Sequence, residues 1–205
     1  FTDLRYGFAN RHLNPRLEIE WRARGVSSKN KLRRWVLSAS GGRRVTQFNA
    51  ESPISELQNS INTLLYGNNF MKIYENYFGE LEFRKKTENG FFFQLQTTYE
   101  DRSPLNNITK FTVNKADSVH ITPNYPFEKI SEQFTPHQAF LIHASVSFRP
   151  GQRYIQYPYT KVPIGSNMPI FNIEYTKGIK GILGSDVDFD KWAFSISDER
   201  NFKIA

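Results

Sequence analysis

The sequence predicts an all-β protein: an antiparallel meander of about eight strands with one short helix in a loop, forming part of a transmembrane β-barrel or a small complete one. Apolar and polar residues alternate over strand-length segments along much of the chain. Aromatic residues make up 15% of its 205 residues although the mean hydropathy is -0.57, as in barrels with a polar interior. No run approaches the roughly 18 apolar residues that a membrane-spanning helix needs.

We expect residues 1–205 to be a single β-barrel segment from a longer barrel, with a helix-containing loop over 49–69 and a long outer loop over 103–136. The first strands are predicted over residues 4–9 and 17–24, with a turn over 10–15. In the second of these strands, four charged residues alternate with apolar ones. Glu and Arg on one strand face can pair across water inside a barrel.

A long strand is predicted over residues 32–48, in which Gly41 and Gly42 indicate a bulge or bend. The pattern then changes, because apolar residues over 52–66 recur at helical spacing. Ser52 suits the N-cap and Pro53 the first helical position, and Gly67 ends the helix. This helix either packs on the sheet as a capped loop or acts as a lid or plug.

The clearest strand-turn-strand signal lies over residues 78–102. A two-residue loop at Asn89 and Gly90 would turn the apolar sets of the two strands to opposite sides of the sheet. A three-residue loop over 88–90, with Gly90 in the left-handed region, brings Phe83 opposite Leu95 instead. We therefore predict the three-residue loop, and its shortness favours the periplasmic side of a barrel.

The connection over residues 103–136 contains four prolines and is long enough to be functional or locally folded. We expect a strand over 107–114 within it. The alternation over residues 140–149 predicts a further strand of membrane-spanning length.

Residues 150–169 are dense in Pro, Gly and Tyr and are not expected to span. A strand is predicted over 170–176, followed by a Gly-rich and then acidic loop over 177–191. Alternation resumes at Trp192 and predicts the last strand.

The polar strand faces are predicted to line a wet lumen, with these residues: Glu18, Glu20, Arg22, Arg24, Glu82, Arg84, Gln94 and Gln96. The apolar faces are predicted to meet lipid or to form an interfacial aromatic girdle, with these residues: Trp21, Trp35, Phe83, Phe91, Phe93, Leu95, Phe148 and Trp192. The alternative is a soluble β-sheet domain that binds a glycan or protein ligand. In that case the polar face meets bulk water, and the aromatic face forms the core or a glycan platform.

The net charge of +7 invites a nucleic-acid interpretation. However, Lys and Arg are interleaved with Glu along the strands, and no aromatic-basic motif of a single-strand binder occurs. We therefore predict no nucleic-acid partner and expect basic residues at strand ends to contact anionic lipid head groups. For any single pair, the alternative is an ordinary solvated surface charge. The chain has no cysteine, which excludes disulfides and thiolate metal sites.

Few residues of the sequence suggest catalysis or metal binding, and we predict that the protein is not an enzyme and has no cofactor. Asp186, Asp188 and Asp190 are spaced like the start of a calcium loop, but the Gly and the bidentate Glu of that motif are missing. An acidic surface loop is the alternative. The four histidines are scattered, and there is no G-x-S-x-G, phosphate loop or dinucleotide fingerprint.

Two segments carry a resemblance. They are NSINTLLYGNNFMKIY over residues 59–74 with YEDRSPL over 99–105, and GQRYI over 151–155 through YTKGIKGILGSDVDFDKW over 175–192. These segments resemble a family of uncharacterised Gram-negative outer-membrane β-barrel proteins with a carboxypeptidase-regulatory-like sandwich ahead of the barrel. The resemblance implies an internal barrel segment in the cell outer membrane, contacting outer-membrane lipid and other envelope proteins. It implies location and architecture only and supplies no catalytic residues. The expectation of a non-enzymatic pore, translocation or assembly role rests on fold analogy with other barrels.

Overall fold

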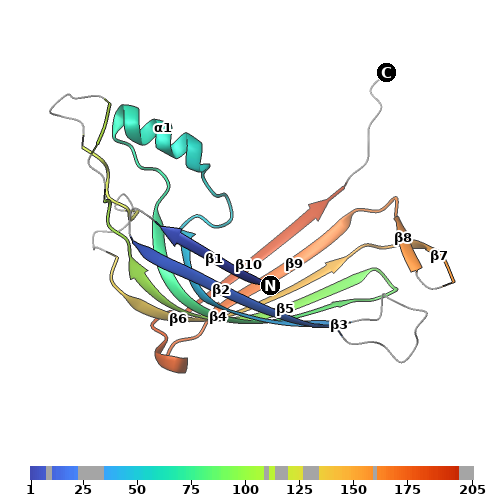
Figure 1. Ribbon diagram of the computed structural model, residues 1–205. Helices are drawn as coiled ribbons and strands as arrows, with labels where there is room; N and C mark the ends of the chain where they lie inside the picture. The colour runs from blue at the N-terminus through green and yellow to red at the C-terminus, as the bar shows by residue number, and fades with distance from the viewer. Residues whose placement is uncertain are drawn as a thin grey trace, which may run out of the picture. The chain divides into compact units, whose positions relative to one another are not determined.

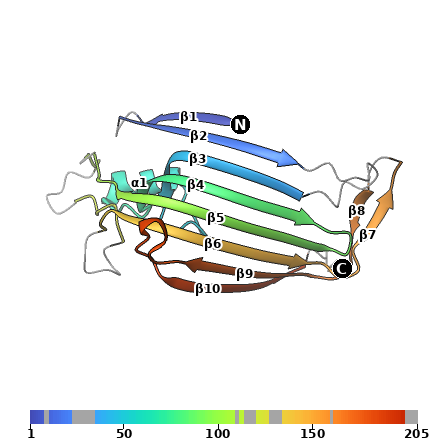
Figure 2. The same ribbon diagram turned by 90° about the horizontal axis from the view of Figure 1, so that it is seen from below.

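The computed structural model confirms the all-β class and describes residues 1–7, 11–22, 35–108, 111–113, 120–126, 134–158 and 161–198 (Figure 1). Eight strands form one antiparallel sheet in the order β1-β2-β3-β4-β5-β6-β9-β10, and β7 pairs with β8 in a second, two-stranded sheet (Figure 2). The elements are β1 (Thr2–Gly7), β2 (His12–Arg22), β3 (Trp35–Gln47), α1 (Glu56–Tyr66), β4 (Ile73–Lys86), β5 (Phe91–Pro104), β6 (His137–Phe148), β7 (Arg153–Gln156), β8 (Lys161–Gly165), β9 (Ile170–Gly178), the 3-10 helix η2 (Ile182–Gly184) and β10 (Phe189–Ser197).

The chain divides into two compact units, which are described separately. The first unit comprises Phe1–Leu17, Gly41–Phe78 and Glu100–Gln138. The second unit comprises Glu18–Ser40, Gly79–Tyr99 and Ala139–Ala205. No described helix is both long and apolar enough to cross a membrane.

In the first unit, β1 and β2 pair from Thr2 opposite Leu17 to Gly7 opposite His12. The predicted turn over 10–15 is therefore wrong for residues 12–15, which belong to the strand. Pro15 lies in this ladder, and Gly42 of β3 has a φ of +148° beside it. A Cβ on Gly42 would lie 2.0 Å from the Pro15 carbonyl oxygen, so only glycine permits this approach of β3.

Helix α1 begins later than predicted, because its N-cap is Ser55 and not Ser52. The Gln47 side chain explains the delay. Its amide donates to the Ile54 carbonyl at 3.1 Å, and its oxygen accepts from the Ile54 N–H at 2.9 Å. This pair of bonds fixes Ile54 outside the helix, so Pro53 cannot occupy the first helical turn.

The predicted end of α1 is confirmed, since Gly67 is the C-cap and has a left-handed φ of 74°. Its N–H donates to the Thr63 carbonyl at 3.0 Å. A Cβ costs about 1 kcal/mol in this conformation, so Gly67→Ala should destabilise the end of α1 by that amount. Hydrogen exchange of the α1 amides should be about fivefold faster in the variant. The exposed Leu57→Ala on the same helix should leave it within about twofold, and equal rates in all three proteins would contradict the prediction.

In the second unit, the hairpin between β4 and β5 has the predicted loop. Thr87 N–H donates to the Phe91 carbonyl at 2.9 Å, and Gly90 has a φ of +85°. Residues 88–90 therefore form the three-residue loop. Counting back from the Thr87–Phe91 pair places Phe83 opposite Leu95 and Glu82 opposite Gln96.

Three further boundaries differ from the predictions. The described residues 107, 108 and 111–113 are not in a strand, so the strand expected over 107–114 is wrong for them. The loop expected over 177–191 is shorter, because β9 extends to Gly178 and β10 begins at Phe189. Gly178 and Phe189 pair with each other. This pair extends the β9–β10 ladder two residues beyond the end of the strand predicted over 170–176. The region 150–169, which is not predicted to span, contains the short hairpin of β7 and β8.

Candidate functional site

One face of the second unit is apolar across three neighbouring strands. The registers align Phe148 with Phe171 and Ile196, then Val146 with Ile173 and Phe194, then Ala144 with Tyr175 and Trp192. We call these nine residues the apolar face. It is not covered by other described residues at the β10 end, where Phe194 is 71% exposed and Ile196 and Trp192 are also exposed.

The opposite face of the same three strands is polar. The residues at the alternate positions of the registers are His143, Ser145, Ser147, Asn172, Glu174, Thr176, Lys191, Ala193 and Ser195. Cross-strand hydrogen bonds join His143 Nδ1 to Thr176 Oγ1 at 2.9 Å and Asn172 Nδ2 to Ser195 Oγ at 3.1 Å. The sheet here has two chemically distinct sides, as the alternation predicts.

The predicted lipid-facing residues gather into aromatic clusters. The Trp35 ring lies 6.2 Å from Phe83, and Phe91 stacks on Phe148 at 4.3 Å and on Phe93 at 5.8 Å. Trp192 lies 4.3 Å from Tyr175. Of the eight residues, five are exposed: Trp21, Trp35, Phe93, Leu95 and Trp192. That they meet lipid stays a prediction.

Several predicted lumen-facing residues form one ionic network in the second unit. Glu20 accepts from Arg22 and from Arg84, the latter at 3.4 Å. Arg84 also contacts Glu82 at 3.3 Å, and Glu82 accepts from the Ser38 hydroxyl at 3.2 Å. The network links β2, β3 and β4 on one side of the sheet.

The remaining predicted lumen residues lie outside this network or have different partners. Gln96 donates to Thr98 at 3.3 Å, and Gln94 is half-buried. Glu18 is half-buried at its position in β2. Arg24 lies outside the described residues. Whether this side faces a lumen stays a prediction.

The first unit contains two buried carboxylates that the sequence patterns do not single out. Glu100 is 4% exposed and accepts from Arg44 at 2.7 Å and from Arg102 at 2.8 Å. Glu75 is also buried, with Arg43 at 2.5 Å and His12 Nδ1 at 3.0 Å. Two of the chain's acidic residues are thus each held between two basic groups.

We call Glu75 and Glu100, with their basic partners, the charged core. Aromatic rings and a buried amide lie beside it. The Arg44 guanidinium lies over the Phe78 ring at 4.0 Å, and that of Arg102 lies over Tyr74 at 5.5 Å. Both rings are buried, so the cations are partly desolvated where they meet them. Asn76 is 0% exposed, and its side-chain atoms have no hydrogen-bond partner among the described residues. The buried residues here are therefore largely polar or charged.

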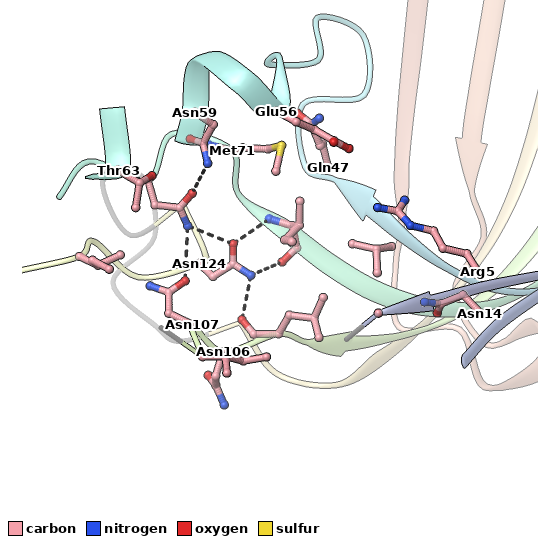
Figure 3. Close-up of a pocket in the computed structure, with 17 residues that line it drawn as sticks. Arg5, Asn14, Gln47, Glu56, Asn59, Thr63, Met71, Asn106, Asn107 and Asn124 are labelled. Carbon is pink, nitrogen blue, oxygen red and sulfur yellow. Dashed lines mark hydrogen bonds between the residues drawn. The ribbon is translucent and has the colours of Figure 1, made fainter. Parts of the chain in front are cut away.

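The first unit also encloses a cavity of about 490 Å³, with a network of asparagines in its wall (Figure 3). Asn59 Nδ2 donates to Asn69 Oδ1 at 2.9 Å, and Asn69 Nδ2 lies 3.4 Å from Asn124 Oδ1. Asn124 donates to the carbonyls of Ile73 at 3.0 Å and Leu105 at 2.9 Å, and accepts from the Ile73 N–H at 3.1 Å. The network ties α1, the segment after it, β4 and two points of the long connection, Leu105 and Asn124, together.

No sequence motif indicates this cavity, because its asparagines are dispersed between positions 59 and 124. Asn59 Oδ1 also accepts from the N–H groups of Phe70 and Met71, both at 2.8 Å. These bonds satisfy backbone groups that no helix or strand pairs. The only available signal is the density of Asn in otherwise irregular segments.

Two acidic residues near the start of β10, Asp188 and Asp190, pair with the side chain of Lys177. Lys177 Nζ lies 3.2 Å from Asp188 and 2.8 Å from Asp190. The Tyr175 hydroxyl donates to Asp190 at 2.5 Å. Within the described ranges, no group of three or more His, Asp or Glu side chains is placed to hold a metal ion.

Comparison with known proteins gives a family but no function. No curated protein and no solved structure matches the chain. One family matches, the family of unknown function (DUF5686), C-terminal domain, and the match covers residues 1–205. This confirms the expectation of an uncharacterised family, whereas the outer-membrane location and the sandwich domain stay predictions. Because the match extends over the whole sequence, the chain belongs to the DUF5686 family as its C-terminal domain.

Proposed function

We propose that this domain forms part of the wall of a transmembrane β-barrel in the cell outer membrane, with a non-enzymatic role as a pore, translocation or assembly component. The observation that carries the proposal is the apolar face of β6, β9 and β10, which is exposed on β10 and partly on β9 and is backed by a polar face on the same strands. In this proposal, lipid acyl chains contact the apolar face.

The distribution of burial supports lipid over water as the solvent of that face. Burying one Phe, Leu or Ile side chain is worth about 1.5–3 kcal/mol in water, so a soluble sheet gains by covering such a surface. Here the buried hydrophobic residues of the described chain are Tyr74, Phe78 and Ala139. The buried polar or charged residues are more numerous, and they include Glu75 and Glu100. A barrel in lipid has this inverted arrangement, with polar groups inside and apolar groups outside.

Strand length and backbone pairing support the same conclusion. The central strands β3 to β6 have 13, 14, 14 and 12 residues, and β9 and β10 have 9 each. A tilted strand needs about 9–11 residues to cross the hydrocarbon core. Hydrogen-bonded strands also satisfy the backbone N–H and C=O groups that lipid cannot.

Spin labels on neighbouring residues of β5 test the proposal. The chain should be reconstituted in lipid vesicles and labelled in turn at Leu95, which is 47% exposed, and at Gln96, the matched control on the other side of the strand. The label at position 95 should be reached by lipid-soluble oxygen and shielded from an aqueous nickel complex. The label at position 96 should respond to the nickel complex.

The alternative function, a soluble β-sheet domain that binds a glycan or protein, predicts a different pattern. In that case the label at position 95 is either buried and shielded from both reagents or open to the nickel complex. Either result would refute the membrane proposal. The same vesicles then give a second readout, because a soluble domain stays in the supernatant after sedimentation.

A further inference from the structure

We propose that the cavity of the first unit binds a short zwitterionic peptide of aliphatic residues. Its volume of about 490 Å³ lies within the range of about 300–1,000 Å³ that small-molecule sites have. All of its lining residues belong to the first unit. The inference therefore goes beyond the membrane proposal and does not depend on it.

Two charges of opposite sign line the cavity from different elements. Arg5 extends from β1, and Glu56 from the first turn of α1 (Figure 3). Neither side chain makes a hydrogen bond or ion pair with another described residue. Both residues are exposed to solvent at the cavity. A ligand with a carboxylate at one end and an ammonium at the other could replace this water with a charge-assisted hydrogen bond to each of them.

Asn14 gives a second and independent indication of a ligand. It lines the same cavity from β2, is 8% exposed, and its Oδ1 has no hydrogen-bond partner among the described residues. A buried acceptor without a partner costs about 1–3 kcal/mol, which a donor on a ligand would recover if the Asn14 amide turns toward the cavity on binding. A peptide N–H is such a donor, whereas an ester or an acyl chain is not.

The remaining wall selects for aliphatic side chains. Val45 of β3, Ile73 of β4 and Ile121 of the long connection contribute branched aliphatic groups. No aromatic residue lines the cavity in the part of the chain that the structure describes. A flat ring, such as that of a sugar or a base, would gain most from an aromatic wall, and this cavity lacks one.

The asparagine network keeps the cavity open without a ligand. The amides of Asn59 and Asn124 are bonded to backbone groups of the chain itself, so they are not available to a ligand and act as framework. A wall fixed in this way needs little reorganisation on binding. Recognition is thus left to Arg5, Glu56 and Asn14.

Calorimetric titration of the reconstituted protein tests the inference with leucyl-leucyl-leucine as the probe. The free tripeptide should bind with saturation at one site. The same peptide with an acetylated amino end and an amidated carboxyl end should bind about tenfold more weakly or not at all, because it loses a charge-assisted hydrogen bond at each end. Equal binding of the free and blocked peptides, or no saturable binding of either, would overturn the inference.

Variants and competitors locate the site. Arg5→Gln and Glu56→Gln should each weaken binding of the free tripeptide about tenfold and should leave the blocked peptide unaffected. The controls Asp3→Asn on β1 and Glu51→Gln before α1 remove charges that do not line the cavity, and they should leave the affinity unchanged. If decyl maltoside displaces the tripeptide completely, or if maltotriose binds in its place, the cavity takes an amphiphile or a sugar and the inference is wrong.

Discussion

Replacement of Glu100 by glutamine should lower the free energy of unfolding by about 3 kcal/mol, because it leaves two guanidinium groups in a polar interior without their carboxylate. Arg44 and Arg102 both bond to this side chain, at 2.7 and 2.8 Å. Both guanidinium groups are partly desolvated, since each also lies over a buried ring. The three tryptophans provide a fluorescence signal for urea titration of the reconstituted protein.

Glu174→Gln is the matched control for this prediction. Glu174 is exposed on the polar face of β9, so its loss should change the free energy of unfolding by no more than about 0.5 kcal/mol. If Glu100→Gln changed the free energy of unfolding by no more than the control does, the ion pairs of Glu100 would not stabilise the fold and the prediction would be wrong. The double variant Glu100→Gln, Arg44→Met should recover part of the loss, because it removes one of the two cations that Glu100 pairs.

A charge on the apolar face should be the second costly change. Phe194 lies at the centre of the β10 row and is 71% exposed, so arginine fits there without a steric clash. In a lipid bilayer, Phe194→Arg should lower the free energy of unfolding by about 2–4 kcal/mol, which is the cost of an arginine on the lipid side of a barrel strand near the midplane. Urea titration in lipid vesicles measures this difference.

The neighbouring residue supplies the control. Ser195 is exposed on the polar face of the same strand, and Ser195→Arg should shift the free energy of unfolding by less than about 0.5 kcal/mol. A soluble domain would tolerate arginine equally at both positions. Equal effects at 194 and 195 would therefore refute the proposed lipid face, whatever their size.

The features that follow from strand periodicity could be predicted from the sequence. Parity alone selected a three-residue loop between β4 and β5, and the Thr87–Phe91 hydrogen bond and the φ of Gly90 confirm it. Alternation likewise located β6, β9 and β10 and their two faces. These predictions succeed because a period of two relates each residue to its neighbours along the same strand.

Features that depend on contacts distant in the sequence could not be predicted. Ser52 and Ser55 are equally good N-caps by residue type, and the choice between them rests on the bonds of Gln47 to Ile54. Pro15 signals a turn locally, yet it lies in a strand because Gly42 makes room for it. In both cases a tertiary contact overrides local propensity.

The charged core of the first unit was missed for a related reason. The alternation of apolar and polar residues predicts the same environment for Glu82 and Glu100, because each lies at a polar position of a strand with one apolar and one polar face. Glu82 is half-buried within the polar network, whereas Glu100 is almost fully buried between two arginines from β3 and β5. Periodicity gives the side of a sheet, but not how many groups from other segments crowd onto it.

The apolar face of β6, β9 and β10 exists only after strand pairing, and this affects how the chain can be handled before it folds. Along the chain, each of its nine members is separated from the next by a polar or small residue or by a turn, so these strands contain no apolar stretch long enough for a membrane-spanning helix. Machinery that retains long apolar helices in a membrane therefore has nothing to recognise here. Cross-strand register thus gives a chain that is hydrophilic on average a surface with a continuous apolar side.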